Sequence, residues 1–141
     1  MRGLGELVLL TLAYSGVGLL ILVAGYFVVD LLTPGHLGRQ VMEDRNVNAG
    51  ILLAAALFSL GLIQWFAVFF SGGGWDSLID VVVFGAIGIA LQAVGFLLLD
   101  VLTPGKLGAI CMATERFHPA SAVAASVQVA VALVVCAALT G

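Results

Sequence analysis

Charged residues are scarce in this chain of 141 residues: only 9% are Asp, Glu, Lys or Arg, whereas 62% are hydrophobic. Soluble domains contain roughly 25% charged residues, so this chain has too few of them to cover a water-facing surface. Only five residues are basic and the formal net charge is −3. These charges are spread over the loops rather than gathered in a patch, and we expect no nucleic-acid partner.

Thiols are also few. Cys111 is expected in a loop and Cys136 near the end of the last helix, so the two cannot meet within one molecule and no structural disulfide is expected. The chain has no P-loop, no nucleophile–base pair, no cofactor motif and no zinc-ligand spacing. We therefore expect no catalytic residue, no metal and no cofactor, and a protein that is not an enzyme.

Long uncharged windows fill most of the chain instead. They cover residues 7–29, 46–75, 81–99 and 119–141. A helix needs about 20 apolar residues to cross the hydrocarbon core of a bilayer. The first window is longer than the apolar part of a signal peptide, and we expect it to be retained. The pattern predicts an all-α integral membrane protein, a single membrane domain over residues 1–141 with four transmembrane helices.

One loop motif occurs twice in the sequence. The stretch DLLTPGHLG at residues 30–38 returns as DVLTPGKLG at residues 100–108, an offset of 70. One extra residue then shifts the offset to 71, at which small residues of the second window pair with small residues of the fourth. The pattern indicates two tandem two-helix repeats, residues 1–71 and 72–141. Because each repeat returns the chain to its starting side, the two repeats are expected in parallel orientation.

The basic residues predict which side each loop faces. Four of the five lie in or just after the two TPG motifs, at Arg39, Arg45, Lys106 and Arg116. The turn between the repeats, residues 71–80, has none. The positive-inside rule therefore places both TPG loops in the cytoplasm and both termini outside.

The loop motif itself ends a helix in each copy. It comprises Thr33, Pro34, Gly35, Thr103, Pro104 and Gly105. A residue before proline is steered away from the helical conformation, so the preceding helix should stop there. Two continuations are open. Thr33 can cap a short amphipathic helix with Pro34 in its first position, or the motif can form a type II turn with glycine third.

The acid before each motif is the main candidate for a functional site. Asp30 and Asp100 are expected at the C-terminal ends of their helices, where the helix dipole disfavours a negative charge. Ionisable residues so close to hydrocarbon are rare and usually functional. Two interpretations are open: a pair of cation or proton sites, or acids that accept hydrogen bonds from their own turns.

Other polar residues have more ordinary interpretations. Gln64, Gln92 and Gln128 fall inside the second, third and fourth windows, where hydrogen bonds between helices are the usual role and a polar path is the alternative. Asp76 is expected to cap the third helix. Asp80 suits the positive dipole end of the same helix.

The doubled acid-L-T-P-G motif, together with Asn48, Ala49 and Gly50 at the start of the second window, resembles the YjfL-like family of small bacterial inner-membrane proteins (domain of unknown function 350). The resemblance covers nearly the whole chain. In the second copy Pro119 and Ala120 replace the Asn-Ala pair. The resemblance implies the bacterial inner (plasma) membrane. It also hints at a cationic metabolite, because members are often encoded beside polyamine-synthase-like proteins.

Two functions follow from these observations. The first is a small oligomeric channel or transporter for cations or a cationic metabolite, supported by the paired acids, the glutamines and the parallel repeat. The second is a membrane scaffold that docks a cytosolic or membrane partner through its two TPG loops. In both cases the helices contact the lipid bilayer, and their large lipid-facing surface favours a homo-oligomer.

Overall fold

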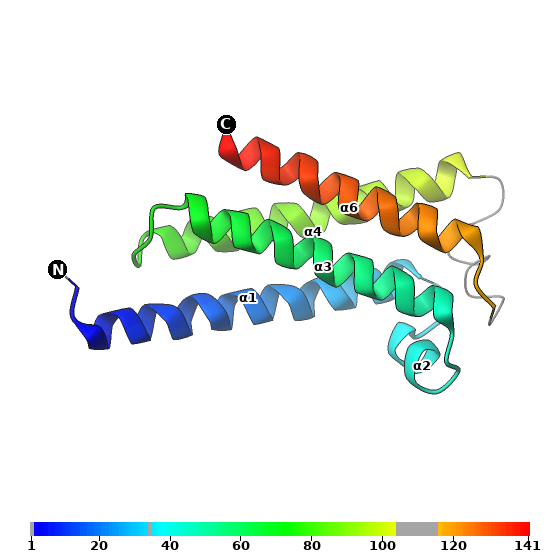
Figure 1. The fold of residues 1–141 in the computed structure, drawn as a ribbon, viewed down its shortest axis with the longest axis horizontal. Coiled ribbons are helices and arrows are strands. Elements are labelled where there is room, and N and C mark those ends of the chain that lie inside the picture. Colours follow the sequence, from blue (N-terminus) through cyan, green and yellow to red (C-terminus); the bar gives the residue numbers. More distant parts are fainter. Residues whose placement is uncertain (1, 34, 104–115) are drawn as a thin grey trace.

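The structure is a computed structural model that describes residues 2–33, 35–103 and 116–141. Within these ranges the chain is all-helical. Its helices are α1 (Leu4–Leu32), α2 (Leu37–Met42), α3 (Val47–Phe70), α4 (Ser77–Leu102) and α6 (Pro119–Thr140). Figure 1 shows the four long helices side by side along one axis, with the short α2 at one end.

The four long helices are each long and apolar enough to cross a membrane, with mean hydropathies of 2.2 to 2.4 in their most apolar stretches. The 24 residues of α3 rise about 36 Å at about 1.5 Å per residue, more than the roughly 30 Å of a hydrocarbon core. The predicted all-α membrane protein with four spanning helices is confirmed. Two of these helices, α1 and α4, extend past their uncharged windows, so Asp80 and Asp100 lie in the first and last turns of α4.

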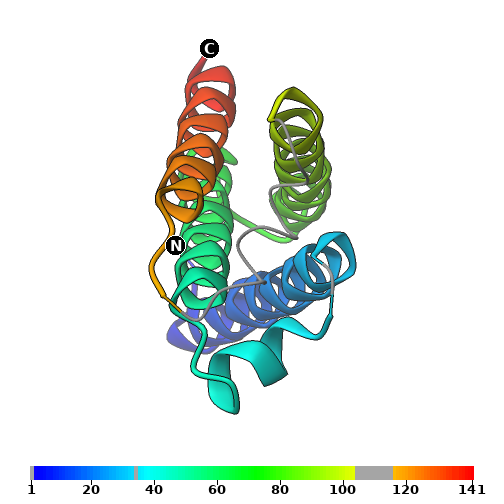
Figure 2. The same cartoon turned by 90° about the vertical axis from the view of Figure 1, so that its right-hand side faces the viewer.

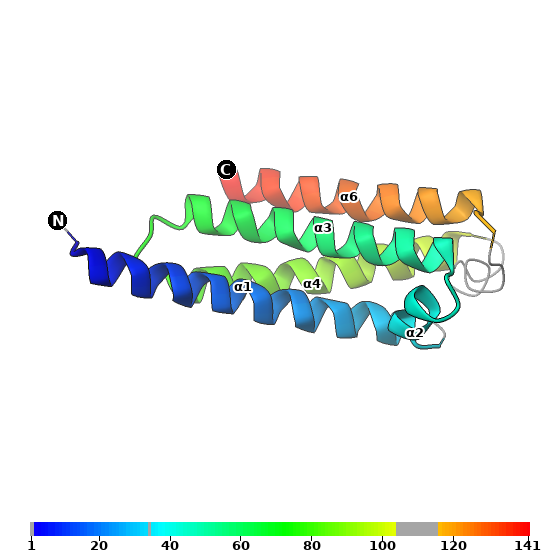
Figure 3. The ribbon, with the colours of Figure 1, turned by 60° about the horizontal axis from the view of Figure 1, so that its bottom comes forward.

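Each long helix runs opposite to the one before it. Both chain termini therefore lie at one end of the bundle, called here the termini end, and α2 lies at the other, the α2 end (Figures 1 and 3). The most extensive contact joins α3 to α6, and α3 also packs on α1 and α4. Among the described residues α1 and α6 have no comparable contact. Figure 2 looks along the bundle and shows α3 between them.

The buried faces of α3 and α6 repeat each other at an offset of 72 residues. The matching pairs are Ala49 and Ser121, Leu52 and Ala124, Ala56 and Gln128, Leu60 and Ala132, Ile63 and Val135, Gln64 and Cys136. This differs by one residue from the offset of 71 obtained by matching small residues. At an offset of 71, Ala54 pairs with Ala125, yet Ala54 is exposed. Small residues occur on several sides of both helices, so their alignment does not define the packed face.

In the first copy, the chain after the TPG motif continues into the short helix α2. Gly35 has a φ of +88°, as the third residue of a type II turn does, and α2 begins two residues later. Leu37 is fully buried against Val29 and Ala56, so α2 is amphipathic as expected. The predicted cap is different, however. His36 precedes α2, whereas Thr33 ends α1.

Candidate functional site

Asp30 joins the end of α1 to the beginning of α2. One oxygen of its carboxylate accepts a hydrogen bond from the backbone N–H of Leu37, and the other lies 3.7 Å from Nδ1 of His36. The side chain is 19% exposed. The first N–H groups of a helix lack partners within the helix and carry partial positive charge, so a carboxylate here is stabilised. This carboxylate supplies the acceptor that Thr33 was expected to provide.

Thr33 and Thr103 make the same contact in the two copies. The Thr33 hydroxyl donates to the carbonyl oxygen of Val29 at 2.8 Å, and the Thr103 hydroxyl to that of Leu99 at 2.7 Å. The backbone N–H of each threonine donates to the same carbonyl. Each threonine therefore closes the last turn of its helix. The other members of the motif, Pro34, Pro104 and Gly105, lie outside the described residues.

Asp100 occupies the corresponding position in the last turn of α4. Its side chain is partly buried, and its Oδ1 atom is buried without a hydrogen-bond partner among the residues that the structure describes. A carboxylate oxygen removed from water in this way is costly unless something compensates for it. Asp30 and Asp100 both lie at the α2 end, one on α1 and the other on α4.

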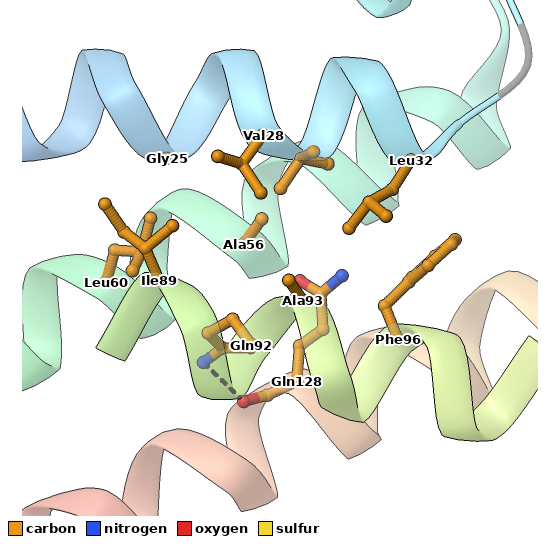
Figure 4. Close-up of a pocket in the computed structure, with 11 residues that line it drawn as sticks. Gly25, Val28, Leu32, Ala56, Leu60, Ile89, Gln92, Ala93, Phe96 and Gln128 are labelled. Carbon is orange, nitrogen blue, oxygen red and sulfur yellow. Dashed lines mark hydrogen bonds between the residues drawn. The ribbon is translucent and has the colours of Figure 1, made fainter. Parts of the chain in front are cut away.

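Two glutamines meet in the middle of the bundle. The amide nitrogen of Gln92 on α4 donates to the backbone oxygen of Gln128 on α6 at 3.0 Å (Figure 4). Their own side-chain oxygens, Oε1 in both cases, have no partner within the described ranges. They adjoin a cavity of about 10 Å³ to which all four long helices contribute. A space of this size is at the lower limit for one water molecule.

Two further polar side chains on α3 are buried without partners. These are the hydroxyl of Ser59 and both amide atoms of Gln64, again counting only the described part of the chain. The amide of Gln64 lies against Gly85 of α4, where a side chain would collide with it. Within the described ranges, Gln92 is thus the one glutamine of the three whose side chain makes the expected interhelical hydrogen bond. Ser59 was not singled out from the sequence, because one serine among many small residues gives no signal.

Asn48 is a second residue whose role the sequence did not reveal. It is fully buried at the start of α3, where its amide nitrogen donates to the backbone oxygen of Arg116 at 2.8 Å. Its side-chain oxygen accepts the backbone N–H of His118, also at 2.8 Å. Asn48 therefore ties α3 to the segment that precedes α6. In the sequence, the Asn-Ala pair of the family pattern was the only feature that drew attention to Asn48.

Together these features define a multi-pass integral membrane protein with a partly polar interior. Across the described ranges, no group of three or more His, Cys, Asp or Glu residues is placed to hold a metal ion. The chain belongs to the family described as Domain of Unknown Function (DUF350), whose family model matches residues 3–139. The family resemblance read from the doubled motif is confirmed.

Similar proteins carry names that agree with this class. A UPF0719 transmembrane protein of Mycobacterium bovis is 39% identical over 134 residues, which is 94% of this chain and 88% of the relative. A UPF0719 transmembrane protein of Mycolicibacterium paratuberculosis is 34% identical over 132 residues, covering 92% and 86%. No solved structure matches the chain.

Proposed function

We propose that the protein is a small, non-enzymatic channel or transporter for cations or a cationic metabolite in the bacterial inner membrane. The observation that carries this proposal is the set of buried polar atoms on α3, α4 and α6 that have no hydrogen-bond partner among the described residues. Each unsatisfied polar group in a membrane interior costs several kcal/mol in the absence of water. Side chains selected only for stability would be apolar at these positions. Their oxygens are suited to receive a cation, a proton carrier or a water molecule in transit.

The placement of acids supports the same function. α4 carries Asp80 in its first turn, Gln92 in its middle and Asp100 in its last turn. A cation that enters at either end of α4 therefore meets a carboxylate there and amide oxygens at the midpoint. The central cavity is too small for a hydrated ion. Passage of anything larger than a proton thus requires the helices to move apart. Of the four long helices, α1 is the least buried, and it has the fewest contacts with the other long helices.

The arrangement of the chain in the membrane is part of the proposal. The matching contacts of Thr33 and Thr103, and the repeated buried face of α3 and α6, support two tandem repeats in parallel orientation. The exposed apolar surface of α1 supports a homo-oligomer, which mass measurement in detergent would detect or exclude. The basic residues near the TPG loops support a cytoplasmic α2 end and termini outside.

Cysteine labelling tests this sidedness. In a variant with both native cysteines replaced by serine, a single cysteine is introduced at Glu43, which is exposed at the α2 end, or at Trp75, which is exposed at the other end. We expect an impermeant thiol reagent to label intact cells through position 75 only. Labelling at 43 in intact cells, with none at 75, would reverse the proposed orientation.

The paired acids provide the test of transport. Asp30→Asn keeps an acceptor for the N–H of Leu37, so the double variant Asp30→Asn with Asp100→Asn should fold. Because it removes both negative charges, we expect it to lose the uptake of K⁺ or a polyamine into proteoliposomes that the wild type supports. Asp44→Asn is the matched control, since Asp44 is an exposed acid at the same end. Wild-type uptake no greater than that of empty liposomes would refute the transport function.

A scaffold is the second candidate, and the surface of α2 favours it. Met42 is 80% exposed, and the ion pair between Arg39 and Glu43 lies on the surface at 3.1 Å. These side chains offer an apolar and charged surface to a cytosolic or membrane partner. Uptake equal in the wild type and the Asp30/Asp100 double variant would favour this function over transport.

A further inference from the structure

A second polar site lies at the termini end, far along the chain from the TPG motifs. The C-terminal ends of α3 and α6 and the first turns of α4, all at this end of the bundle (Figure 1), contribute residues to an open pocket of about 250 Å³. Its lining includes Asp80, Phe70, Phe84 and Ser71. This space is slightly smaller than the roughly 300–1,000 Å³ of typical ligand pockets, so it suits a small ligand.

Among the described residues, Asp80 is the charged residue that lines this pocket. Asp80 forms no ion pair with any residue that the structure describes. Arg2, the one basic residue at this end among those that the structure describes, lies beside Gly74 and 3.9 Å from Glu6. The pocket also receives the ends of α3 and α6, whose last carbonyl groups lack partners within the helix and carry partial negative charge.

The aromatic rings add a third attraction for a cation. A cation over the face of Phe is stabilised by the negative face of the ring. A carboxylate in the first turn of α4 alone would be explained by the helix dipole, and Asp76 at the N-cap has the same advantage. The dipole does not explain why Asp80 shares a pocket with two phenylalanines and two helix C-termini, whereas a bound cation does.

We propose that this pocket binds the ammonium group of a small organic cation. The proposal rests on the proposed function, because it makes the pocket the entry site for cations at the termini end and assigns them to the class of organic amines. Asp80 binds the charge, and Phe70 and Phe84 contact the alkyl groups around it. Two sources present this chemistry to the pocket: a soluble amine, or the headgroup of an amino lipid such as phosphatidylethanolamine.

Equilibrium binding of choline to the purified protein tests the site without any transport. The protein is placed in nanodiscs of phosphatidylglycerol, and choline is titrated in by calorimetry. The matched uncharged ligand is the analogue with a tert-butyl group in place of trimethylammonium. We expect choline to bind and the analogue not to bind. Equal binding of the two ligands would overturn the proposal. The absence of choline binding, both in these nanodiscs and in nanodiscs that contain phosphatidylethanolamine, would also overturn it.

Two variants and one control assign the binding to this pocket. Asp80→Asn should weaken choline binding about tenfold or more, as loss of a charge-assisted contact does. Phe84→Leu should weaken it roughly two- to fivefold, in line with an exposed cation–π contact. Asp76→Asn removes an acid of the same helix outside the pocket and should leave affinity unchanged. Wild-type affinity in both Asp80→Asn and Phe84→Leu, each with a normal melting curve, would overturn the proposal.

Two further comparisons complete the experiment. The first distinguishes a soluble amine from a lipid headgroup, and the second distinguishes failure of this site from failure of the transport function. If choline binding weakens when phosphatidylethanolamine replaces phosphatidylglycerol, the lipid headgroup occupies the same site. Unchanged binding points to a soluble amine. Choline binding without cation uptake in proteoliposomes would keep the site and remove the transport function. Uptake by a protein that binds no choline would keep transport and remove the site.

Discussion

The Asn48→Ala protein is expected to be less stable than the wild type by about 1 to 3 kcal/mol, because the substitution removes the hydrogen bonds that this side-chain amide makes to two backbone groups, at about 0.5–1.5 kcal/mol each. These groups are the carbonyl of Arg116 and the N–H of His118. Asn48 is fully buried, so water cannot easily replace its amide. For a chain of this length, the melting temperature in detergent should fall on the order of 10 °C.

Two other variants establish that the effect comes from this amide. Asn48→Asp has nearly the same shape and keeps the oxygen that accepts from His118, but it places a buried carboxylate oxygen against the carbonyl of Arg116, so it should melt no higher than Asn48→Ala. Asn46→Ala removes the cap of α3, where the Asn46 side chain accepts two backbone N–H groups. Its cost should be smaller, about 1 kcal/mol. Wild-type melting of Asn48→Ala would contradict the link between α3 and the segment before α6.

Replacing both central glutamines should have the opposite effect on stability. The side-chain oxygens of Gln92 and Gln128 are buried without partners in the described part of the chain. Leucine is similar in volume and has no polar atom to satisfy. The double variant Gln92→Leu with Gln128→Leu loses one hydrogen bond, from Gln92 to a backbone oxygen, but removes both unpaired oxygens.

We therefore expect this double variant to be more stable than the wild type by about 1 to 3 kcal/mol, the usual cost of a buried polar group left unpaired. The midpoint of thermal unfolding in detergent measures the change. The two single variants apportion the effect, because only Gln92→Leu loses the hydrogen bond to Gln128. A double variant that melts below the wild type would mean that the glutamines hold the helices together.

The spanning helices were predictable from the sequence because their length is a local property set by the bilayer. Clusters of charge divide the chain into windows, and each window became one long helix. The start of α6 at Pro119 agrees with the start of the fourth uncharged window, and proline is tolerated at a first helical position. Asp76 does precede α4 as expected, although its side chain makes no capping hydrogen bond.

The contacts between helices were not predictable, because they depend on which face of each helix packs. The alignment of small residues missed the packed register of α3 and α6 by one position. The hydrogen bonds of Asn48 reach residues about seventy positions away, and no local pattern specifies them. The role of Asp30 was half predicted: an acid at the turn was expected to accept hydrogen bonds, but its acceptance of the N–H of Leu37 needed the path of the chain through Gly35.

The pocket around Asp80 could not be found from the sequence for a related reason. Its lining comes from the ends of three helices that are distant in the chain. In the sequence Asp80 is explained by the dipole of its own helix, and Phe70 and Phe84 are two apolar residues among many. Only the way α3, α4 and α6 end together brings the carboxylate and the rings to one place.

The most direct test of the polar interior as a cation path is uptake by the variant that lacks its central polar groups. Proteoliposomes with the wild type and with the Gln92→Leu, Gln128→Leu protein are given the same outward-to-inward gradient of protons, K⁺ or a small amine, and uptake is followed over time. We expect proteoliposomes with the wild type to take up at least one of these cations. Proteoliposomes with the double variant, although it is more stable, should take up no more of that cation than empty liposomes do. Wild-type uptake by the double variant would contradict a path through the centre of the bundle.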